Sequence, residues 1–254
     1  MPPVVSEAYR EKKKEEILNS ALVCFANKGF ENSTIDDIVA HSGISKGSIY
    51  IYFKSKEDIY VEMISRQTKQ SFEKITSEVA QLKSSFEKVN YLFQLYLAPN
   101  FPAGDEEVRK MLVSFEFKLY SSRHKHINDL LTKRRHEYFI SLVAGILKDG
   151  QQSGEVSSHI KPEIYADLFW TMIDGLLMQS VYKDYPQQEI LLQMQRMFNE
   201  GVKNGENSTI ASSSEQSASS PDIAKVPHVA VSASIYQDLN IIGSGPNKIP
   251  PLLF

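Results

Sequence analysis

Residues 29–59 decide the fold, and they read GFENSTIDDIVAHSGISKGSIYIYFKSKEDI. The stretch predicts two short helices that are joined by a tight turn. Thr34 is placed to cap the first helix, and Asp37 completes a capping box and adds negative charge at the positive helix end. Gly43 marks the turn because a residue without Cβ adopts positive φ freely. Ser45 is then expected to be the N-cap of the second helix.

The second of these helices has one apolar side. Ile49 and Phe53 lie four residues apart and are expected to be buried together. Its other sides are small or able to hydrogen-bond, and they carry Gly47, Ser48, Tyr50 and Ile51. A helix with short side chains near its N-terminus suits the DNA major groove, because its backbone approaches base edges closely. This pattern predicts a DNA-reading helix.

Basic residues accompany this helix. Lys46, Lys54 and Lys56 fall in eleven residues that hold no acid, and each is suited to neutralise a phosphate. Over residues 1–57, however, eight basic residues meet eight acidic ones, and the whole chain has a net charge of -3. A polyanion must therefore be met by a local basic patch and not by the field of the whole protein.

The rest of the chain up to residue 203 has helical periodicity. Apolar residues recur at intervals of three and four, with Gly and Pro between the segments, and no stretch alternates as a half-buried strand does. The predicted fold class is all-α. Residues 204–254 are rich in Ser and Pro and have almost no apolar periodicity, so we expect a flexible tail.

The composition narrows the class of protein. The chain has 254 residues, 42% hydrophobic and 23% charged, as is typical of soluble globular proteins. Cys24 is the only cysteine, which excludes an internal disulfide and a Cys-based zinc site. No signal peptide and no run of about 18 apolar residues is present. We therefore expect a cytoplasmic protein that does not span a membrane.

Residues 16–59 resemble the DNA-binding domain of the tetracycline-repressor (TetR) family of bacterial regulators. The match is ungapped over more than forty positions. The matching positions include Phe25, Gly29, Phe30, Thr34, Ile38, Gly43, Ser45, Gly47, Tyr50, Phe53 and Lys56. The resemblance implies three helices, the third reading DNA, and a long fourth helix that starts near Lys56. It also implies a helix-turn-helix domain at 1–56 and a helical effector-binding and dimerisation domain at 57–203, which the tail at 204–254 follows.

The resemblance also assigns roles at the DNA. Phosphate contacts fall to Thr34, Tyr50 and Lys56. Residues at or near base edges are Ser45, Lys46, Gly47, Ser48 and Tyr52. Two alternatives stay open. Tyr50 and Tyr52 are also explained by ordinary aromatic packing, and Lys46 and Lys54 by solvated surface charge.

A homodimer is implied because one short reading helix covers only a few base pairs. Useful specificity needs two such helices about 34 to 36 Å apart, on a palindromic operator in double-stranded DNA. Residues 163–182 are apolar nearly all round, so one face can serve the core and another a partner, together with residues 190–198. Gly175 in mid-helix is explained if two backbones approach closely there.

The resemblance further implies a small-molecule effector, of apolar or aromatic character, among the middle helices. The candidate lining residues are Tyr96, Phe115, Glu116, Tyr120, Tyr138, Trp170, Asp174 and Met178. Glu116 and Asp174 stand in apolar stretches, and a buried carboxylate needs a partner such as a cationic ligand or Arg134. The alternative is that the aromatic residues are ordinary core and that Glu116 reaches solvent.

Other functions have weaker support. The sequence lacks the nucleotide-binding, zinc-protease and serine-hydrolase motifs, so we expect no enzyme, catalytic residue or cofactor. A metal site from His124, His126 and His136 is disfavoured because the first two diverge on a helix. The remaining alternative is a helical ligand- or metal-binding protein that has this fold but does not bind DNA.

Overall fold

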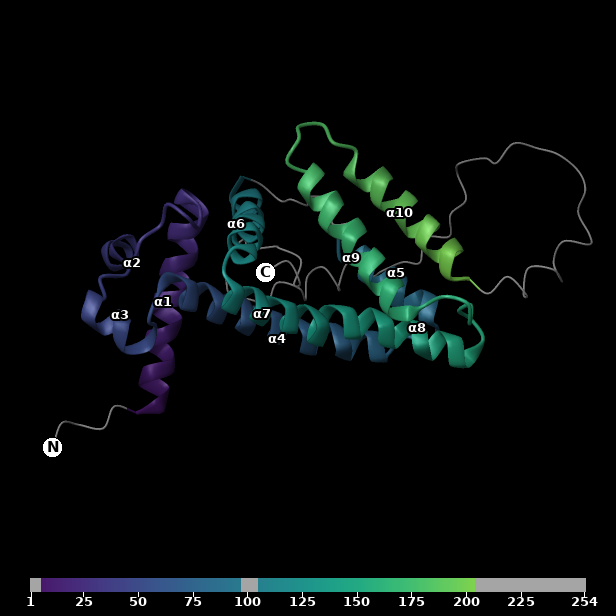
Figure 1. Ribbon diagram of the computed structural model, residues 1–254, viewed down its shortest axis with the longest axis horizontal. Coiled ribbons are helices and arrows are strands. Elements are labelled where there is room, and N and C mark those ends of the chain that lie inside the picture. Colours follow the sequence, from purple (N-terminus) through teal and green to yellow (C-terminus); the bar gives the residue numbers. More distant parts are fainter. Residues whose placement is uncertain (1–5, 97–104, 204–254) are drawn as a thin grey trace, which may run out of the picture.

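The computed structural model describes residues 6–96 and 105–203, except for the side chains of 105–107, and these residues are predominantly helical (Figure 1). The first helices are α1 (Glu7–Lys28), α2 (Ile35–Ser42), α3 (Lys46–Tyr52), α4 (Lys56–Ala80) and α5 (Ser85–Gln94). They are followed by α6 (Asp105–Ser122), α7 (Lys125–Arg134), the π-helix η1 (Arg135–Ile140), α8 (Ser141–Ser153), α9 (Pro162–Gln179) and α10 (Gln187–Val202). Extended pairing within the described ranges is limited to one isolated bridge between Val156 and Lys203. The all-α prediction is confirmed.

Local signals set the ends of the first three helices. Gly29 ends α1 with φ of 78°, and Gly43 ends α2 in the left-handed region with φ of 69°. Both halves of the capping box are present at α2, because Thr34 accepts from the Asp37 N–H and Asp37 accepts from the Thr34 N–H. Ser45 caps α3 through its side chain. The caps expected from the sequence are all confirmed.

Helix α4 connects the helix-turn-helix end to the rest of the molecule. Its 25 residues span about 37 Å at the usual rise, and α7, η1 and α8 run beside it (Figure 1). The rings of Phe72 and Tyr138 meet edge to face at 5.1 Å between these two layers. Helix α4 starts at Lys56, as the resemblance implied, and Ser55 is its N-cap.

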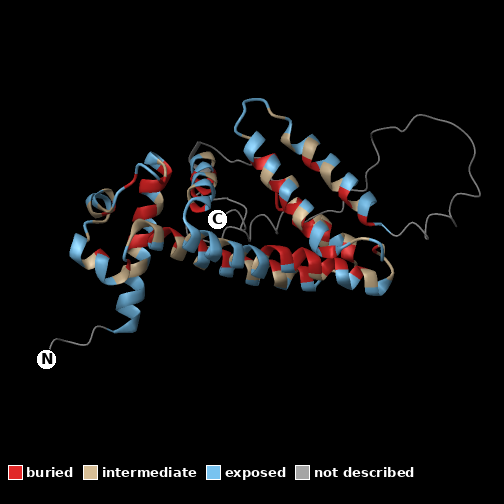
Figure 2. Ribbon diagram, in the orientation of Figure 1, coloured by how far each residue is buried: buried red, intermediate tan, exposed pale blue. Residues whose placement is uncertain are grey.

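The core of the second part lies between α5, α8, α9 and α10. Phe93, Phe169 and Phe198 form an edge-to-face cluster, with ring centroids 4.7 to 5.8 Å apart. Figure 2 shows buried residues along the inward faces of α8 and α9, whereas α3 is mostly exposed. This core holds the helices that surround the site described below.

The sequence also predicted a flexible tail and the absence of a membrane-spanning helix. The tail predicted at 204–254 lies outside the described residues. Among the helices that the structure describes, none is both long and apolar enough to cross a membrane.

Candidate functional site

Helix α3 shows the predicted division into a buried and an exposed side. Ile49 is fully buried and Phe53 nearly so, while Tyr50 is 48% and Ile51 69% exposed. The other side of α3 stays accessible because the helix turns its apolar side, with Ile49 and Phe53, toward the core. The arrangement leaves a short, exposed helix at one end of the molecule (Figure 1).

The residues expected at the DNA differ in exposure. Those with exposed side chains or backbone are Thr34, Ser45, Lys46, Gly47, Tyr50 and Lys54. Ser48 is half-buried, and its hydroxyl lies 2.8 Å from that of Ser45. Tyr52 is also half-buried and packs against the core, as in the packing alternative left open above. Tyr50 is therefore the better placed of the two tyrosines to reach DNA.

Lys46 is positioned at the N-terminus of α3 by an ion pair with Asp36 of α2, at 2.8 Å. Both side chains are at least half exposed, and a pair of this kind contributes little to stability. The hydrogen bond that Lys46 donates to Asp36 raises the pKa of the Lys46 ammonium, so the group stays charged. Lys46 is free to exchange its carboxylate partner for a phosphate.

Lys56 has partners that the sequence did not predict. Its ammonium donates to the backbone carbonyls of Phe30, Glu31 and Ser33 at 2.7 to 3.0 Å, and it lies 4.7 Å from the centre of the Phe30 ring. An ammonium has three donors, and all three are used. Lys56 therefore holds the loop between α1 and α2 to the start of α4 instead of presenting its charge to solvent.

Helix α6 is joined to the DNA-reading end by two polar contacts. The Glu116 carboxylate accepts a hydrogen bond of 2.7 Å from the Phe30 N–H, and the Tyr120 hydroxyl donates to Glu57 at 3.0 Å. The hydrogen bond with Glu57 raises the pKa of Tyr120, although burial is the larger cause. Glu116 thus connects α6 to the helix-turn-helix domain. Tyr120 connects α6 to the start of α4, and its ring also contacts that of Phe30, with centroids 5.1 Å apart.

Tyr60 of α4 lies at the centre of an aromatic cluster. Its ring centroid is 5.7 Å from that of Phe25, 5.4 Å from that of Phe30 and 4.1 Å from that of Phe117. These rings come from α1, the α1–α2 loop and α6. The cluster joins the helix-turn-helix domain to the helices behind it.

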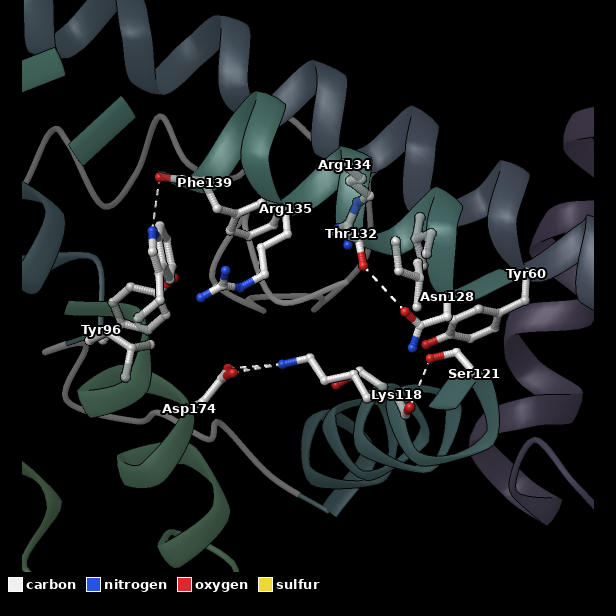
Figure 3. A pocket seen from close by; sticks show the side chains of 15 residues that line it. Tyr60, Tyr96, Lys118, Ser121, Asn128, Thr132, Arg134, Arg135, Phe139 and Asp174 are labelled. Atoms are coloured by element: carbon white, nitrogen blue, oxygen red, sulfur yellow. Dashed lines mark hydrogen bonds and ion pairs between the residues drawn. The ribbon is translucent and has the colours of Figure 1, made fainter. Parts of the chain in front are cut away.

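A cavity of about 280 Å³ lies directly behind this cluster, between α4, α6, α7, η1 and α9 (Figure 3). Part of its wall is apolar and part is polar. Tyr60, Ile64, Tyr96, Ser114, Lys118, Ser121, Asn128, Leu131, Thr132, Arg134, Arg135, Phe139, Trp170, Ile173 and Asp174 line it. Its size is close to the lower limit of small-molecule sites in proteins.

Part of the cavity wall is a π-helix. Arg135 and Phe139 belong to η1, which interrupts the otherwise continuous α7 and α8. Such single turns occur frequently at functional sites. The Trp170 indole N–H donates to the Phe139 carbonyl at 2.9 Å, which attaches α9 to this turn.

Only some of the predicted lining residues reach the cavity. Tyr96, Trp170 and Asp174 line it, whereas Phe115, Glu116, Tyr120, Tyr138 and Met178 do not. Two of the latter, Glu116 and Tyr120, contact the helix-turn-helix domain instead, and Met178 is exposed. Tyr138 lines a second, smaller depression of about 200 Å³ between α4 and α7.

The expectation of buried carboxylates was wrong. Glu116 is exposed, and the Asp174 side chain is 47% exposed and pairs with Lys118 at 2.9 Å. Arg134, the suggested partner, contacts neither carboxylate and instead donates to the Thr68 hydroxyl. Sequence reasoning missed Tyr60 and Lys118, because nothing in the spacing of α4 and α6 shows which of their residues meet.

The three histidines considered for metal binding have different surroundings. His124 stacks on Tyr120 with ring centroids 3.9 Å apart, and its Nδ1 lies 2.8 Å from the Tyr120 carbonyl. His126 and His136 are exposed. Within the described part of the chain, no three His, Cys, Asp or Glu residues are grouped to hold a metal ion.

Helix α9 has a buried side and an exposed side. Ala166, Phe169, Ile173 and Leu177 point into the core. Ile164, Leu168, Thr171, Gly175 and Met178 follow one another at intervals of four and three and are all exposed. A Cβ added at Gly175 would meet nothing within 4 Å. This stripe is an apolar helix face that no described residue of the chain covers.

Comparisons with known proteins place the chain in a family. Residues 17–63 match the model "Bacterial regulatory proteins, tetR family", and residues 93–201 match "BetI-type transcriptional repressor, C-terminal". The chain belongs to the TetR family. The resemblance in the helix-turn-helix sequence is thereby confirmed, and this TetR-family protein is a DNA-binding transcriptional regulator that responds to a ligand.

Proteins with similar sequences or structures match most of this chain. The uncharacterized HTH-type transcriptional regulator YfiR of Bacillus subtilis is 29% identical over 72% of this chain and 87% of its own length. The fatty acid metabolism regulator protein of the same species is 24% identical, over 69% and 87%. The crystal structure of FadR from B. subtilis in complex with stearoyl-CoA has a TM-score of 0.55 and 19% identity, covering 74% of this chain and 98% of that one. At this identity the structural likeness shows the fold.

Proposed function

We propose that this TetR-family regulator is a repressor that binds a palindromic operator as a homodimer and is released when a small molecule enters the cavity behind Tyr60. It acts in the cytoplasm and catalyses no reaction. Residues 1–56 read DNA, and residues 57–203 hold the effector and the dimer interface. Of the described residues, Thr34, Lys46 and Tyr50 make the principal contacts with the duplex, together with the backbone at Gly47.

One observation carries the link between ligand and DNA. The Tyr60 ring packs against Phe25 and Phe30 of the helix-turn-helix domain, and the same side chain lines the cavity. A molecule that moves Tyr60 must also repack these rings, because protein cores are close-packed. Typical allosteric coupling of about 1 to 3 kcal/mol would weaken operator binding roughly 5- to 150-fold.

Helix α6 provides a second connection between the two sites. Lys118 and Ser121 line the cavity, while Glu116 and Tyr120 of the same helix contact Phe30 and Glu57. A rotation or shift of α6 that accommodates a ligand therefore displaces the loop between α1 and α2. We propose that α4 and α6 act together in release.

The dimer interface is assigned to the exposed stripe of α9, with Leu192 and Met197 of α10 beside it. Leu192 and Met197 are 43% and 56% exposed, so they add apolar surface to that of the stripe. Joining two copies here would cover these groups and give two copies of α3. Each operator half-site then receives one reading helix.

The proposal is tested by selecting bound DNA from a random pool. We expect enrichment of an inverted repeat with half-site centres about 10 base pairs, or a multiple, apart. Lys46→Ala should weaken binding and reduce the slope of log affinity against log salt by about 1. Lys125→Ala is the matched control, because Lys125 is also exposed and paired with an aspartate but lies on α7. If no sequence is enriched, the result would favour the alternative that this protein has the fold but does not bind DNA.

A further inference from the structure

Arg134 brings an unmatched positive charge to the cavity wall. Its guanidinium donates to the Thr68 hydroxyl at 2.8 Å and lies 4.9 Å from the centre of the Phe139 ring. Among the described residues it has no carboxylate partner. Burial lowers the pKa of Arg134 to about 10, so the group is charged at neutral pH but is held in an unfavourable environment. Arg134 is partly buried. Charges removed from water in proteins are usually paired, so an anion bound in the cavity would stabilise this guanidinium.

The other charges around the cavity are already balanced. Lys118 pairs with Asp174 at 2.9 Å, and this ion pair is drawn in Figure 3. Arg135 pairs with Asp167, also on α9. The cavity therefore has an excess of one positive charge, and that charge belongs to Arg134.

An unpartnered hydroxyl lines the same cavity. Tyr60 is 1% exposed, and its hydroxyl has no hydrogen-bond partner in the described structure. Burial raises the pKa of Tyr60 while the charge of Arg134 acts in the opposite direction, so the group is a protonated donor within the field of the guanidinium. A buried hydroxyl without a partner is unfavourable, because it has lost its hydrogen bonds to water and gained none in the protein. Tyr60 and Arg134 are both donors and therefore need an acceptor.

Apolar groups form another part of the wall. Ile64, Leu131, Phe139, Trp170 and Ile173 line the cavity. The volume of about 280 Å³ equals that of roughly nine water molecules at ~30 Å³ each. The space thus suits a compact molecule with a polar head at Tyr60 and Arg134 and an apolar body against Trp170.

We propose that this cavity binds a small monocarboxylic acid, whose carboxylate accepts hydrogen bonds from Arg134 and Tyr60 and whose apolar body packs against Phe139 and Trp170. The inference rests on the proposed function only in treating the cavity as the effector site. A cationic ligand would place its charge beside Arg134. A phosphate monoester carries about -1.5 to -2 at neutral pH, which exceeds the single uncompensated charge.

Trp170 supplies the readout, because it is the only tryptophan of the sequence and it lines the cavity. Its fluorescence is titrated in the full-length protein with octanoate, octan-1-ol and octylammonium, and with phenylacetate and 2-phenylethanol. At least one carboxylate should bind about tenfold or more tightly than its matching alcohol, as expected for hydrogen bonds to a charged group. If neither does, or if octylammonium binds best, the proposal is wrong.

Variants identify the residues that recognise the carboxylate. Arg134→Gln should remove the preference over the alcohol, while Arg134→Lys retains part of it. Tyr60→Phe should weaken carboxylate binding severalfold and leave the affinity for the alcohol nearly unchanged. Arg123→Gln is the matched control, because Arg123 is exposed immediately after the end of α6 and does not line the cavity. A preference that survives in Arg134→Gln would overturn the assignment, and melting curves of each variant show that it is folded.

DNA binding separates this inference from the proposed function. If octanoate or phenylacetate binds in an Arg134-dependent way but leaves operator binding unchanged, the carboxylate site stands and the proposed release mechanism fails. If the regulator is released from DNA by a ligand whose binding does not depend on Arg134 or Tyr60, the mechanism stands and the carboxylate assignment fails.

Discussion

The carboxylate of Glu116 accepts a hydrogen bond of 2.7 Å from the backbone N–H of Phe30, 86 residues earlier in the chain. Phe30 follows Gly29, the residue that ends α1, and a Cβ at Gly29 would lie 2.9 Å from the same carboxylate. The glycine thus allows α6 to approach the helix-turn-helix domain. This hydrogen bond connects α6 directly to the loop that precedes α2.

We predict that Glu116→Ala uncouples ligand from DNA more than it weakens DNA binding. Without the carboxylate, movement of α6 is transmitted to Phe30 less effectively, and about 1 kcal/mol of coupling is lost. Operator affinity should be nearly unchanged without ligand, whereas the ligand-induced loss of affinity should be smaller by about fivefold. Fluorescence anisotropy with labelled operator measures both. Glu137→Ala, an exposed carboxylate outside this contact, should behave as the wild type, and equal uncoupling in both variants would contradict the assignment.

Lys56 and Lys54 are predicted to differ in the type of defect they cause. Lys56→Met removes three hydrogen bonds to the α1–α2 loop and should lower the free energy of unfolding by about 1 to 3 kcal/mol. Lys54→Met should leave stability within about 0.5 kcal/mol, because its side chain is exposed. Urea unfolding of both variants measures this free energy of unfolding.

The salt dependence of operator binding shows whether Lys54 and Lys56 contact phosphates. Lys54→Met should reduce the salt slope by about 1, whereas Lys56→Met should not change it while the protein is folded. A reduced slope in Lys56→Met would show that this lysine leaves its carbonyl partners to contact a phosphate. The resemblance to the family originally suggested that role.

Asp37 should make stability depend on pH in acid. The hydrogen bond from Lys28, followed by those from the Thr34 backbone and side chain, lowers its pKa from 3.8 to about 2. A carboxylate with a depressed folded-state pKa stabilises the fold above its unfolded pKa, and this contribution disappears as the pH falls from about 4 to about 2. The difference in urea midpoint between wild type and Asp37→Asn should therefore shrink over this range. If Asp36→Asn shows the same convergence, charge and not the capping box is responsible.

The α9 stripe should determine oligomeric state. Leu168→Glu places two charges in the proposed interface of each dimer, one from each copy, and should raise the dimer dissociation constant by about 100-fold or more. Light scattering after size exclusion measures the mass. Leu130→Glu is the matched control, because Leu130 on α7 is equally 40% exposed. A Leu168→Glu protein that keeps the wild-type mass would remove α9 from the interface.

The DNA-reading end could be predicted almost completely from the sequence. Thr34, Gly43 and Ser45 set helix ends through contacts within three or four residues, and the four-residue spacing of Ile49 and Phe53 fixed which side of α3 is buried. Such signals are local, so they survive in any tertiary context that keeps the helices. The same reasoning predicted that the chain is helical up to residue 203 and that residues 163–182, which include most of α9, are apolar.

The effector cavity was only partly predictable, because it is formed by side chains from helices far apart in sequence. Aromatic residues such as Tyr120 and Tyr138 had the right chemistry but face other partners, whereas Tyr60 and Lys118 gave no signal of their own. Periodicity shows which side of a helix is apolar, but it does not show which other helix covers that side. Helix identity, caps and the exposed side of α3 were therefore determined by the sequence alone, while the partners of Lys56, the uncompensated charge of Arg134 and the cavity itself were decided by how α4, α6, α7 and α9 pack together.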